Sequence, residues 1–279
     1  MNISPDENQT NSILRESNLS TPQATLNLAI GPPNGPMLIL LHGFTNRWQT
    51  FQAIIPALTR NWQVLAFDHR GHGASTRVPG GYSAAGFYAD AAAVLNACVT
   101  QPAVLLGHSM GGSLALHLAQ DVPDKVRAVV TGDTSLDLSM HIQAMNERRR
   151  TKLFGLRRKL AGRPLDELIR RGLDPEQAEE MSQLDPHIMD FHAEGRVQDF
   201  FKDINDLDFD SIRCPLLLTQ ANPLKGGLVQ DAEIETVLMA QPRFHFQRFD
   251  TGHDLDIKQG PQSPFFQAAL AFINQLEAA

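Results

Sequence analysis

The sequence predicts an α/β fold: a mostly parallel sheet wound with helices on both faces and interrupted by one inserted helical segment. Apolar runs at 37–41, 103–106 and 215–219 have the length of strands that are buried on both faces. Helical patterns alternate with these runs, which is typical of parallel strands joined by crossover helices. From 136 to 208 the sequence becomes helical and charged, without a convincing strand. A chain of 279 residues can bury the core that this fold requires.

Charge and cysteine content limit the partners that we expect. The net charge is -7 at pH 7, which argues against nucleic-acid binding because phosphate recognition needs a basic surface. Residues 1–18 are polar and contain no apolar core, so we expect neither a signal peptide nor a membrane span. Cys98 and Cys214 are far apart in sequence, and we expect them to be reduced. A cytoplasmic protein with a small-molecule substrate is therefore predicted, and its oligomeric state is left open.

The elements follow from local patterns. Residues 1–12 have little to bury and predict a loose tail. Before the insertion we expect strands at 13–19, 24–30, 37–41, 63–67, 103–106 and 126–131, and helices at 46–60, 84–99 and 114–119. After the insertion we expect a strand at 215–219, a helix at 231–240, a strand at 243–249 and a final helix at 264–276.

The chain must reverse sharply between the strand at 103–106 and the helix that follows it. Ser109 lies at the reversal, with Gly107 and Gly111 on either side and Gly112 available for close packing. The run Gly-His-Ser-Met-Gly at 107–111 resembles the nucleophile elbow, G-x-S-x-G, of the α/β-hydrolase family. That resemblance implies that Ser109 is a nucleophile.

Two further runs resemble the same family. The strand at 37–41 ends in His-Gly-Phe, which implies an oxyanion hole made by the backbone N–H groups of Phe44 and Met110. The run at 68–75 resembles the structural turn D-x-R-G-x-G-x-S, so we expect structural rather than metal-binding roles for His69 and His72. No metal is expected. The resemblance covers the chain from residue 37 to its end, apart from the insertion.

In this family the insertion forms a helical cap over the active site. We therefore assign residues 1–135 and 209–279 to the hydrolase core and residues 136–208 to the cap. The cap contains a basic run, Arg148–Lys159, that could attract an acidic substrate. We favour a solvated helix face, balanced by acidic residues such as those at 174–180. Four apolar cap residues could line a pocket or simply seat the cap on the sheet: Met189, Phe191, Phe200 and Phe201.

A serine nucleophile needs a base, and His253 is our choice. It follows the last expected strand within Asp-Thr-Gly-His-Asp, where the family's catalytic histidine lies in a Gly-His pair. An ordinary imidazole titrates near neutral pH and can therefore take and return a proton. We interpret His108 and His117 as packing or access residues.

The acid of the triad departs from the usual pattern. Most of the family places an aspartate in a G-x-x-D run before the last strand, but the corresponding residues 221–224 are Ala-Asn-Pro-Leu. Asp133 ends the strand after the nucleophile unit, and some family members take the acid from that strand end. We predict that Asp133 orients His253. The alternatives are a helix-capping role for Asp133 and Asp137 as the acid, while Asp254 and Asp256 should face solvent.

These residues predict a cofactor-independent hydrolase of carboxylic esters or lactones that acts through a Ser-His-Asp triad and an acyl-enzyme. Serine at the elbow disfavours haloalkane and epoxide hydrolysis, which in this fold proceeds through an aspartyl ester. A cofactor-free dioxygenase or a carbon-carbon bond hydrolase, which use the same constellation, remains an alternative. A second alternative is a non-catalytic ligand-binding protein that keeps the fold but has lost the acid of the triad, since Leu224 stands where the family usually has a carboxylate.

Overall fold

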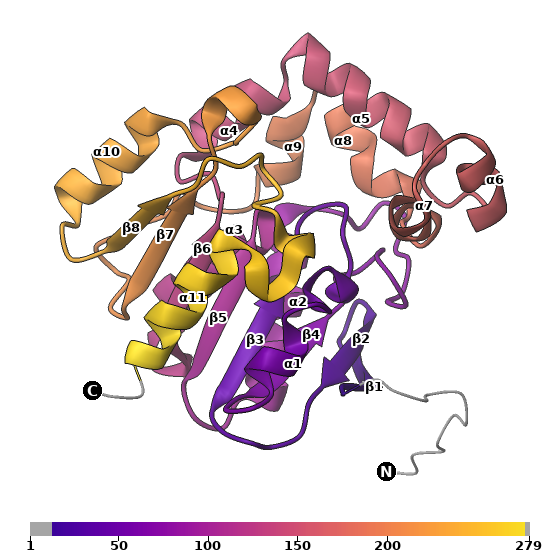
Figure 1. The fold of residues 1–279 in the computed structure, drawn as a ribbon. Coiled ribbons are helices and arrows are strands. Elements are labelled where there is room, and N and C mark those ends of the chain that lie inside the picture. Colours follow the sequence, from indigo (N-terminus) through magenta and orange to yellow (C-terminus); the bar gives the residue numbers. More distant parts are fainter. Residues whose placement is uncertain (1–12, 277–279) are drawn as a thin grey trace.

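The fold is built on one eight-stranded sheet, shown in Figure 1. The computed structural model describes residues 13–276, so the tail expected at 1–12 lies outside the described residues. The strand order is β1-β2-β4-β3-β5-β6-β7-β8. The six strands β3 to β8 run parallel, whereas β2 pairs antiparallel with β1 and β4. The predicted α/β fold with a mostly parallel sheet is confirmed.

The strands lie close to the expected positions. Their bounds are β1 Arg15–Ser20, β2 Thr25–Ile30, β3 Met37–Leu41, β4 Gln63–Phe67, β5 Ala103–His108, β6 Val126–Gly132, β7 Leu216–Gln220 and β8 His245–Arg248. The central strands β3 and β5 are almost entirely buried because helices cover both of their faces.

Helices cover both faces of the sheet. Leu38 and Leu40 of β3 belong to one buried cluster and Ile39 and Leu41 to another, as the alternation of side chains along a strand requires. The helices α2 (Ala84–Cys98), α3 (Met110–Asp121) and α10 (Asp231–Ala240) contribute to the cluster of Ile39. The short helix α1 (Ile55–Leu58) and α11 (Pro264–Gln275) contribute to the cluster of Leu38. The sheet is therefore doubly wound, as predicted.

The single helix that we expected at 46–60 is wrong. The structure has a 3₁₀ helix at Trp48–Phe51 and a separate four-residue helix, α1. Pro56 lies in the first turn of α1. A proline there has no N–H to donate to residue 52, and its ring would collide with the carbonyl of that residue in a continuous helix. The apolar spacing is present, but proline divides the segment in two.

Only helices connect β6 to β7, and they lie together above the carboxyl ends of the strands in Figure 1. They are α4 (Leu138–Met145), α5 (Arg148–Leu160), α6 (Leu165–Arg170), α7 (Pro175–Ser182), a 3₁₀ helix (Pro186–Met189), α8 (Asp190–Ala193) and α9 (Val197–Phe201). The described chain thus carries a helical cap where the strand pattern stops. Its boundaries at residues 136 and 208 remain predictions.

Two further sequence predictions concern location. Within residues 13–276, no helix combines the length and the apolar character that a membrane crossing needs. Both Cys98 and Cys214 are free thiols, and burial raises the pKa of Cys214 to about 11. The cytoplasmic location remains a prediction.

Candidate active site

Ser109 occupies a strained turn between β5 and α3. Its φ of 54° and ψ of -119° are unfavourable for a residue with a side chain. The glycines around it are required by backbone packing: a methyl group at Gly111 would lie 2.1 Å from the carbonyl oxygen of Leu41. A methyl group at Gly112 would lie 1.9 Å from Thr134 Oγ1, so the close packing expected at this glycine is present. The turn places Ser109 on the wall of a cavity.

The structure brings Ser109, His253 and Asp133 together in one hydrogen-bonded chain. His253 Nε2 lies 3.0 Å from Ser109 Oγ, and His253 Nδ1 lies 2.6 Å from Asp133 Oδ2. The strand order β5-β6-β7 explains this meeting, because Ser109 and Asp133 follow neighbouring parallel strands whose carboxyl ends share one edge. These are the three residues that the sequence analysis named as the triad, and the structure brings them together. Their catalytic roles remain predictions.

Asp133 is fully buried, and backbone N–H groups hold its carboxylate. The N–H groups of Ala221 and Leu228 donate to it at 3.1 and 2.7 Å. Burial alone would raise the pKa of Asp133, but the hydrogen bonds from His253, Leu228 and Ala221 outweigh burial and bring the pKa below its ordinary value. The side chain is therefore an anion that can accept a hydrogen bond from His253 Nδ1–H, as a triad acid requires.

The loop after β7 supplies backbone N–H donors to Asp133 and no carboxylate to His253. Leu224, at the position where the family usually has its acid, is 96% exposed and points away from the site. Asp137, the rival acid, caps α4 by accepting the N–H of Met140 at 2.8 Å. Asp254 is exposed at the rim of the cavity. Among these carboxylates, Asp133 alone is bonded to His253.

The two expected oxyanion donors lie on the same cavity as Ser109. The N–H groups of Phe44 and Met110 have no hydrogen-bond acceptor within residues 13–276. Met110 is the first residue of α3, so its N–H also lies at the positive end of that helix dipole. His72 Nε2 lies 2.7 Å from the carbonyl oxygen of Phe44 and fixes the loop that carries the first donor. An oxyanion role for both N–H groups remains a prediction.

The other histidines near the site make structural contacts. His108 Nε2 lies 2.8 Å from the backbone carbonyl oxygen of His253 and supports the loop that carries it. His117 bridges the carbonyl oxygens of Ser113 and Asn205. His69 and His72 are fully buried in the turn after β4, and burial lowers the pKa of His69 to about 3. In the part of the chain described, no three His, Cys, Asp or Glu side chains gather in a way that could hold a metal ion.

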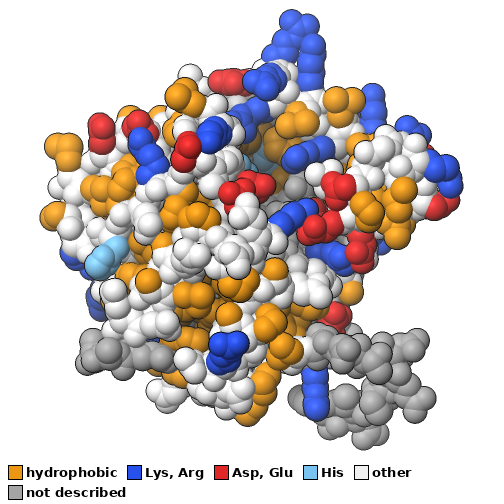
Figure 2. Space-filling view, in the orientation of Figure 1, with side chains coloured by type: hydrophobic (Ala, Val, Ile, Leu, Met, Phe, Trp, Pro, Cys, Tyr) orange, Lys and Arg blue, Asp and Glu red, His pale blue; other side chains and the backbone are white. Residues whose placement is uncertain are grey.

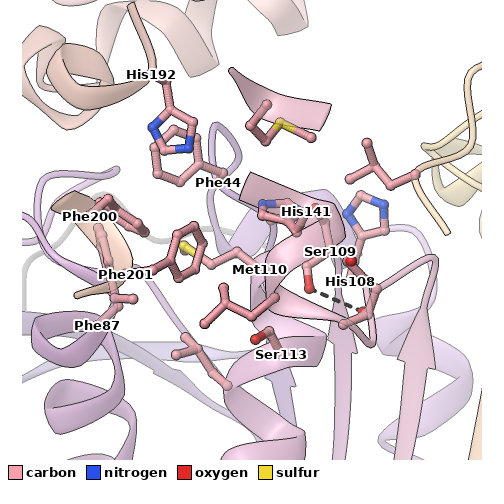
Figure 3. A pocket seen from close by; sticks show the side chains of 18 of the residues that line it. Phe44, Phe87, His108, Ser109, Met110, Ser113, His141, His192, Phe200 and Phe201 are labelled. Carbon is pink, nitrogen blue, oxygen red and sulfur yellow. Dashed lines mark hydrogen bonds between the residues drawn. The ribbon is translucent and has the colours of Figure 1, made fainter. Parts of the chain in front are cut away.

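A cavity of about 450 Å³ separates this site from the cap (Figure 3). Its lining includes five phenylalanines among other apolar residues: Phe44, Phe87, Phe154, Phe200 and Phe201. Two of the four apolar cap residues that we named therefore line it. Of the other two, Met189 is buried in the core and Phe191 packs against Phe200, so both seat the cap. Sequence analysis missed His141 and His192, which also line the cavity and carry no motif.

Comparison with known proteins identifies the family of this chain. A family described as "alpha/beta hydrolase fold" matches residues 36–178, about half of the chain. The chain belongs to the α/β hydrolase fold family. A 2-(acetamidomethylene)succinate hydrolase from Mesorhizobium japonicum is 33% identical over 100 residues, 36% of this chain and 36% of the relative. Epoxide hydrolase B from Mycobacterium tuberculosis is 35% identical over 108 residues, 37% of this chain and 30% of the relative. The alignments thus span about a third of these relatives.

Solved structures match this α/β hydrolase over nearly its whole length. E-2-(acetamidomethylene)succinate hydrolase superposes with a TM-score of 0.68 at 19% identity, covering 95% of this chain and 100% of the other. The enol-lactonase from Burkholderia xenovorans gives a TM-score of 0.68 at 16% identity, covering 94% and 100%. At these identities the likeness shows a shared fold.

Five of the seven basic residues in the run on α5 are exposed, as expected of a solvated face, but the run also contributes to the cavity. Arg150 and Arg157 line the cavity. Arg158 is paired with Asp190 and Glu194 of the neighbouring α8 segment, and no ion pair joins the run to the acidic residues at 174–180 within the described chain. The run therefore has two different faces, because the cap folds one side of α5 over the cavity.

Buried histidines predict acid sensitivity. His192 is 4% exposed, lies among Phe44, Phe154 and Phe200, and has a pKa that burial lowers to about 3. Between pH 6.5 and about 3 the unfolded chain protonates this ring while the folded protein does not, so the free energy of unfolding falls as pH falls. In His192→Phe, the dependence of that free energy on pH should weaken by about 1.4 kcal/mol per pH unit. Urea titrations between pH 4 and 6 measure it, and an unchanged slope would contradict the assignment.

Proposed function

We propose that the protein is a serine hydrolase of carboxylic esters or lactones. The observation that carries the proposal is the chain of hydrogen bonds from Asp133 through His253 to Ser109, at the wall of an apolar cavity. A serine hydroxyl at 3.0 Å from an imidazole can lose its proton as it attacks a carbonyl carbon. The buried anion behind the ring stabilises the imidazolium that forms.

The reaction follows from these positions in two halves. Ser109 Oγ bonds to the carbonyl carbon while His253 Nε2 takes the hydroxyl proton. The carbonyl oxygen becomes negative and accepts hydrogen bonds from the backbone N–H groups of Phe44 and Met110. The tetrahedral intermediate collapses, and His253 returns the proton to the departing alcohol oxygen. Water then attacks the acyl-enzyme by the same steps and releases the acid. No cofactor enters this scheme.

Names among the similar proteins agree with this reaction class. The solved structures of similar fold include an enol-lactonase, a protein described as a putative aryl esterase and an enzyme that degrades N-acyl homoserine lactones. The epoxide hydrolases among the curated relatives match over only 30% and 19% of their own length. Serine rather than aspartate at the elbow favours the ester or lactone reaction for this chain.

The experiment that tests the proposal is a screen of short-chain 4-nitrophenyl esters and simple lactones, run with and without oxygen. We expect hydrolysis at equal rates in both atmospheres and no oxygen uptake. A cofactor-free dioxygenase would instead consume oxygen with a hydroxyquinolone-type substrate, and a carbon-carbon bond hydrolase would cleave a diketone but no ester. Absence of any turnover would favour the ligand-binding alternative.

A further inference from the structure

One face of α5 forms a wall of the cavity. Arg150, Leu153, Phe154 and Arg157 all line it. Their spacing of three, four and seven residues places them on a single side of a helix. The arginines therefore lie two turns apart on the same side as two apolar residues, facing the space beside Ser109.

The remaining basic residues of α5 do not line the cavity. They are Arg148, Arg149, Lys152, Arg158 and Lys159. Arg158 is committed to Asp190 at 3.1 Å and Glu194 at 3.4 Å. Lys and Arg side chains gather along the top of Figure 2, where α5 lies in Figure 1. The helix thus offers an internal comparison between arginines that face the cavity and an arginine, Arg149, that does not.

Arg150 has no carboxylate partner and no side-chain hydrogen bond within residues 13–276. It is half-buried, in contrast to the exposed Arg149. A guanidinium carries five N–H donors, and those of Arg150 have no acceptor among the described residues, so they are available to a ligand in the cavity. An anion inside the cavity would satisfy these donors.

Arg150 and the reaction centre at Ser109 line the same cavity. His141 lines it as well, and its pKa is lowered to about 4, first by burial and then by the charge of Arg150. This ring is consequently neutral at pH 7. A ligand in the cavity would share this space with both Arg150 and Ser109.

Acidic side chains on the cavity do not neutralise Arg150. Asp137 is engaged in capping α4, and Asp254 is exposed at the rim. Arg157 is partly compensated by the negative charge of Glu180, which favours its charged form. Glu180 itself accepts a hydrogen bond from Asn46 at 3.3 Å and forms no ion pair with Arg157 within the described chain. Arg150 is therefore the cation most available to a ligand.

We propose that Arg150, assisted by Arg157, binds a free carboxylate of the substrate, so that the preferred substrates are esters or lactones that carry a second, ionised carboxyl group. This inference rests on the proposed function of the same site. The guanidinium would hold the carboxylate through paired charge-assisted hydrogen bonds, while the ester carbonyl lies at Ser109 between aromatic walls.

The test compares two pairs of esters that differ in one carboxylate. The first pair is the 4-nitrophenyl monoester of glutaric acid and 4-nitrophenyl pentanoate, with the charge on the acyl side. The second is 4-carboxyphenyl butyrate and phenyl butyrate, with the charge on the leaving group. We expect wild-type protein to prefer the charged member of at least one pair. Arg150→Gln should lower the charged-to-neutral ratio of kcat/KM for that pair by about 10- to 100-fold.

Arg149→Gln is the matched control, because it removes the same charge from a neighbouring residue of the same helix that does not line the cavity. This variant should keep the wild-type ratio. If Arg149→Gln and Arg150→Gln lower the ratio equally, the preference comes from the total positive charge of α5 and not from a contact between Arg150 and the substrate carboxylate. The proposal is then overturned. It is also overturned if neither pair shows a dependence on Arg150.

A binding measurement separates this inference from the proposed hydrolase activity. The Ser109→Ala protein, with and without Arg150→Gln, is titrated by calorimetry with the charged esters. Binding that requires Arg150 supports the carboxylate site, even if the wild-type protein cleaves no ester. Absence of ester cleavage would overturn the hydrolase proposal alone. If the protein hydrolyses both kinds of ester and Arg150→Gln leaves the charged-to-neutral ratio of kcat/KM unchanged, the hydrolase proposal stands. The carboxylate site is then overturned.

Discussion

Ser109→Ala should lower kcat for any ester that the wild-type protein hydrolyses by about 10⁶-fold, because no other oxygen replaces the nucleophile. The hydroxyl lies 3.0 Å from His253 Nε2, and removing it leaves the base with nothing to activate except water. At position 109, alanine would have the same backbone strain at φ 54° as the native serine, so the Ser109→Ala variant should fold. The measurement is the steady-state rate with a 4-nitrophenyl ester, alongside thermal unfolding of both proteins.

Ser113→Ala provides the control for this result. Ser113 also lines the cavity from α3 (Figure 3), but its hydroxyl forms no hydrogen bond with His253 in the described structure. Its loss should change kcat by less than about tenfold. A Ser109→Ala protein that retains more than about one hundredth of the wild-type rate would contradict a nucleophilic role for Ser109.

Asp133→Asn should reduce kcat by about 10⁴-fold. Asp133 accepts the Nδ1 proton of His253 and the N–H groups of Ala221 and Leu228. An asparagine has one acceptor oxygen and turns an NH₂ donor toward a group that also donates. The ring would lose its partner or adopt the wrong tautomer, and the buried N–H left unpaired should lower the free energy of unfolding by about 1–3 kcal/mol.

Three variants separate a triad acid from a general loss of negative charge. Asp137→Asn should leave both the N-cap of α4 and the activity nearly unchanged, because asparagine can also accept the N–H of Met140, and Asp254→Asn should leave the rate nearly unchanged because its side chain is exposed. Leu224→Asp should restore nothing to Asp133→Asn, since residue 224 points into solvent. A near-normal rate for Asp133→Asn would show that another acid, or none, completes the site.

The sequence predicted the core well because its signals are local. The bounds expected for the strands at 37–41 and 63–67 agree with β3 and β4, since short apolar runs mark strands buried on both faces. Asp133 could be proposed because adjacent parallel strands end at one edge of a sheet. Pro56 is a local signal too, and the continuous helix at 46–60 was wrong because apolar spacing was given more weight than proline.

The cap could not be predicted at the same level. The spacing of Arg150, Leu153, Phe154 and Arg157 shows that they share one side of a helix, but not which side faces the sheet. That orientation depends on how α5 packs against α8 and the 3₁₀ helix at 186–189, through contacts distant in sequence. For the same reason, no pattern in the sequence indicates that His141 and His192 line the cavity.

The most direct test of the account is to locate the covalent adduct formed with an organophosphate such as diisopropyl fluorophosphate. Such reagents trap a serine that a neighbouring base has activated. Peptide mass spectrometry should find one adduct, on Ser109, and its formation should slow markedly in His253→Ala. An adduct on a different residue, or ester hydrolysis that continues with Ser109 unmodified, would contradict the claim that His253 activates Ser109 as the nucleophile.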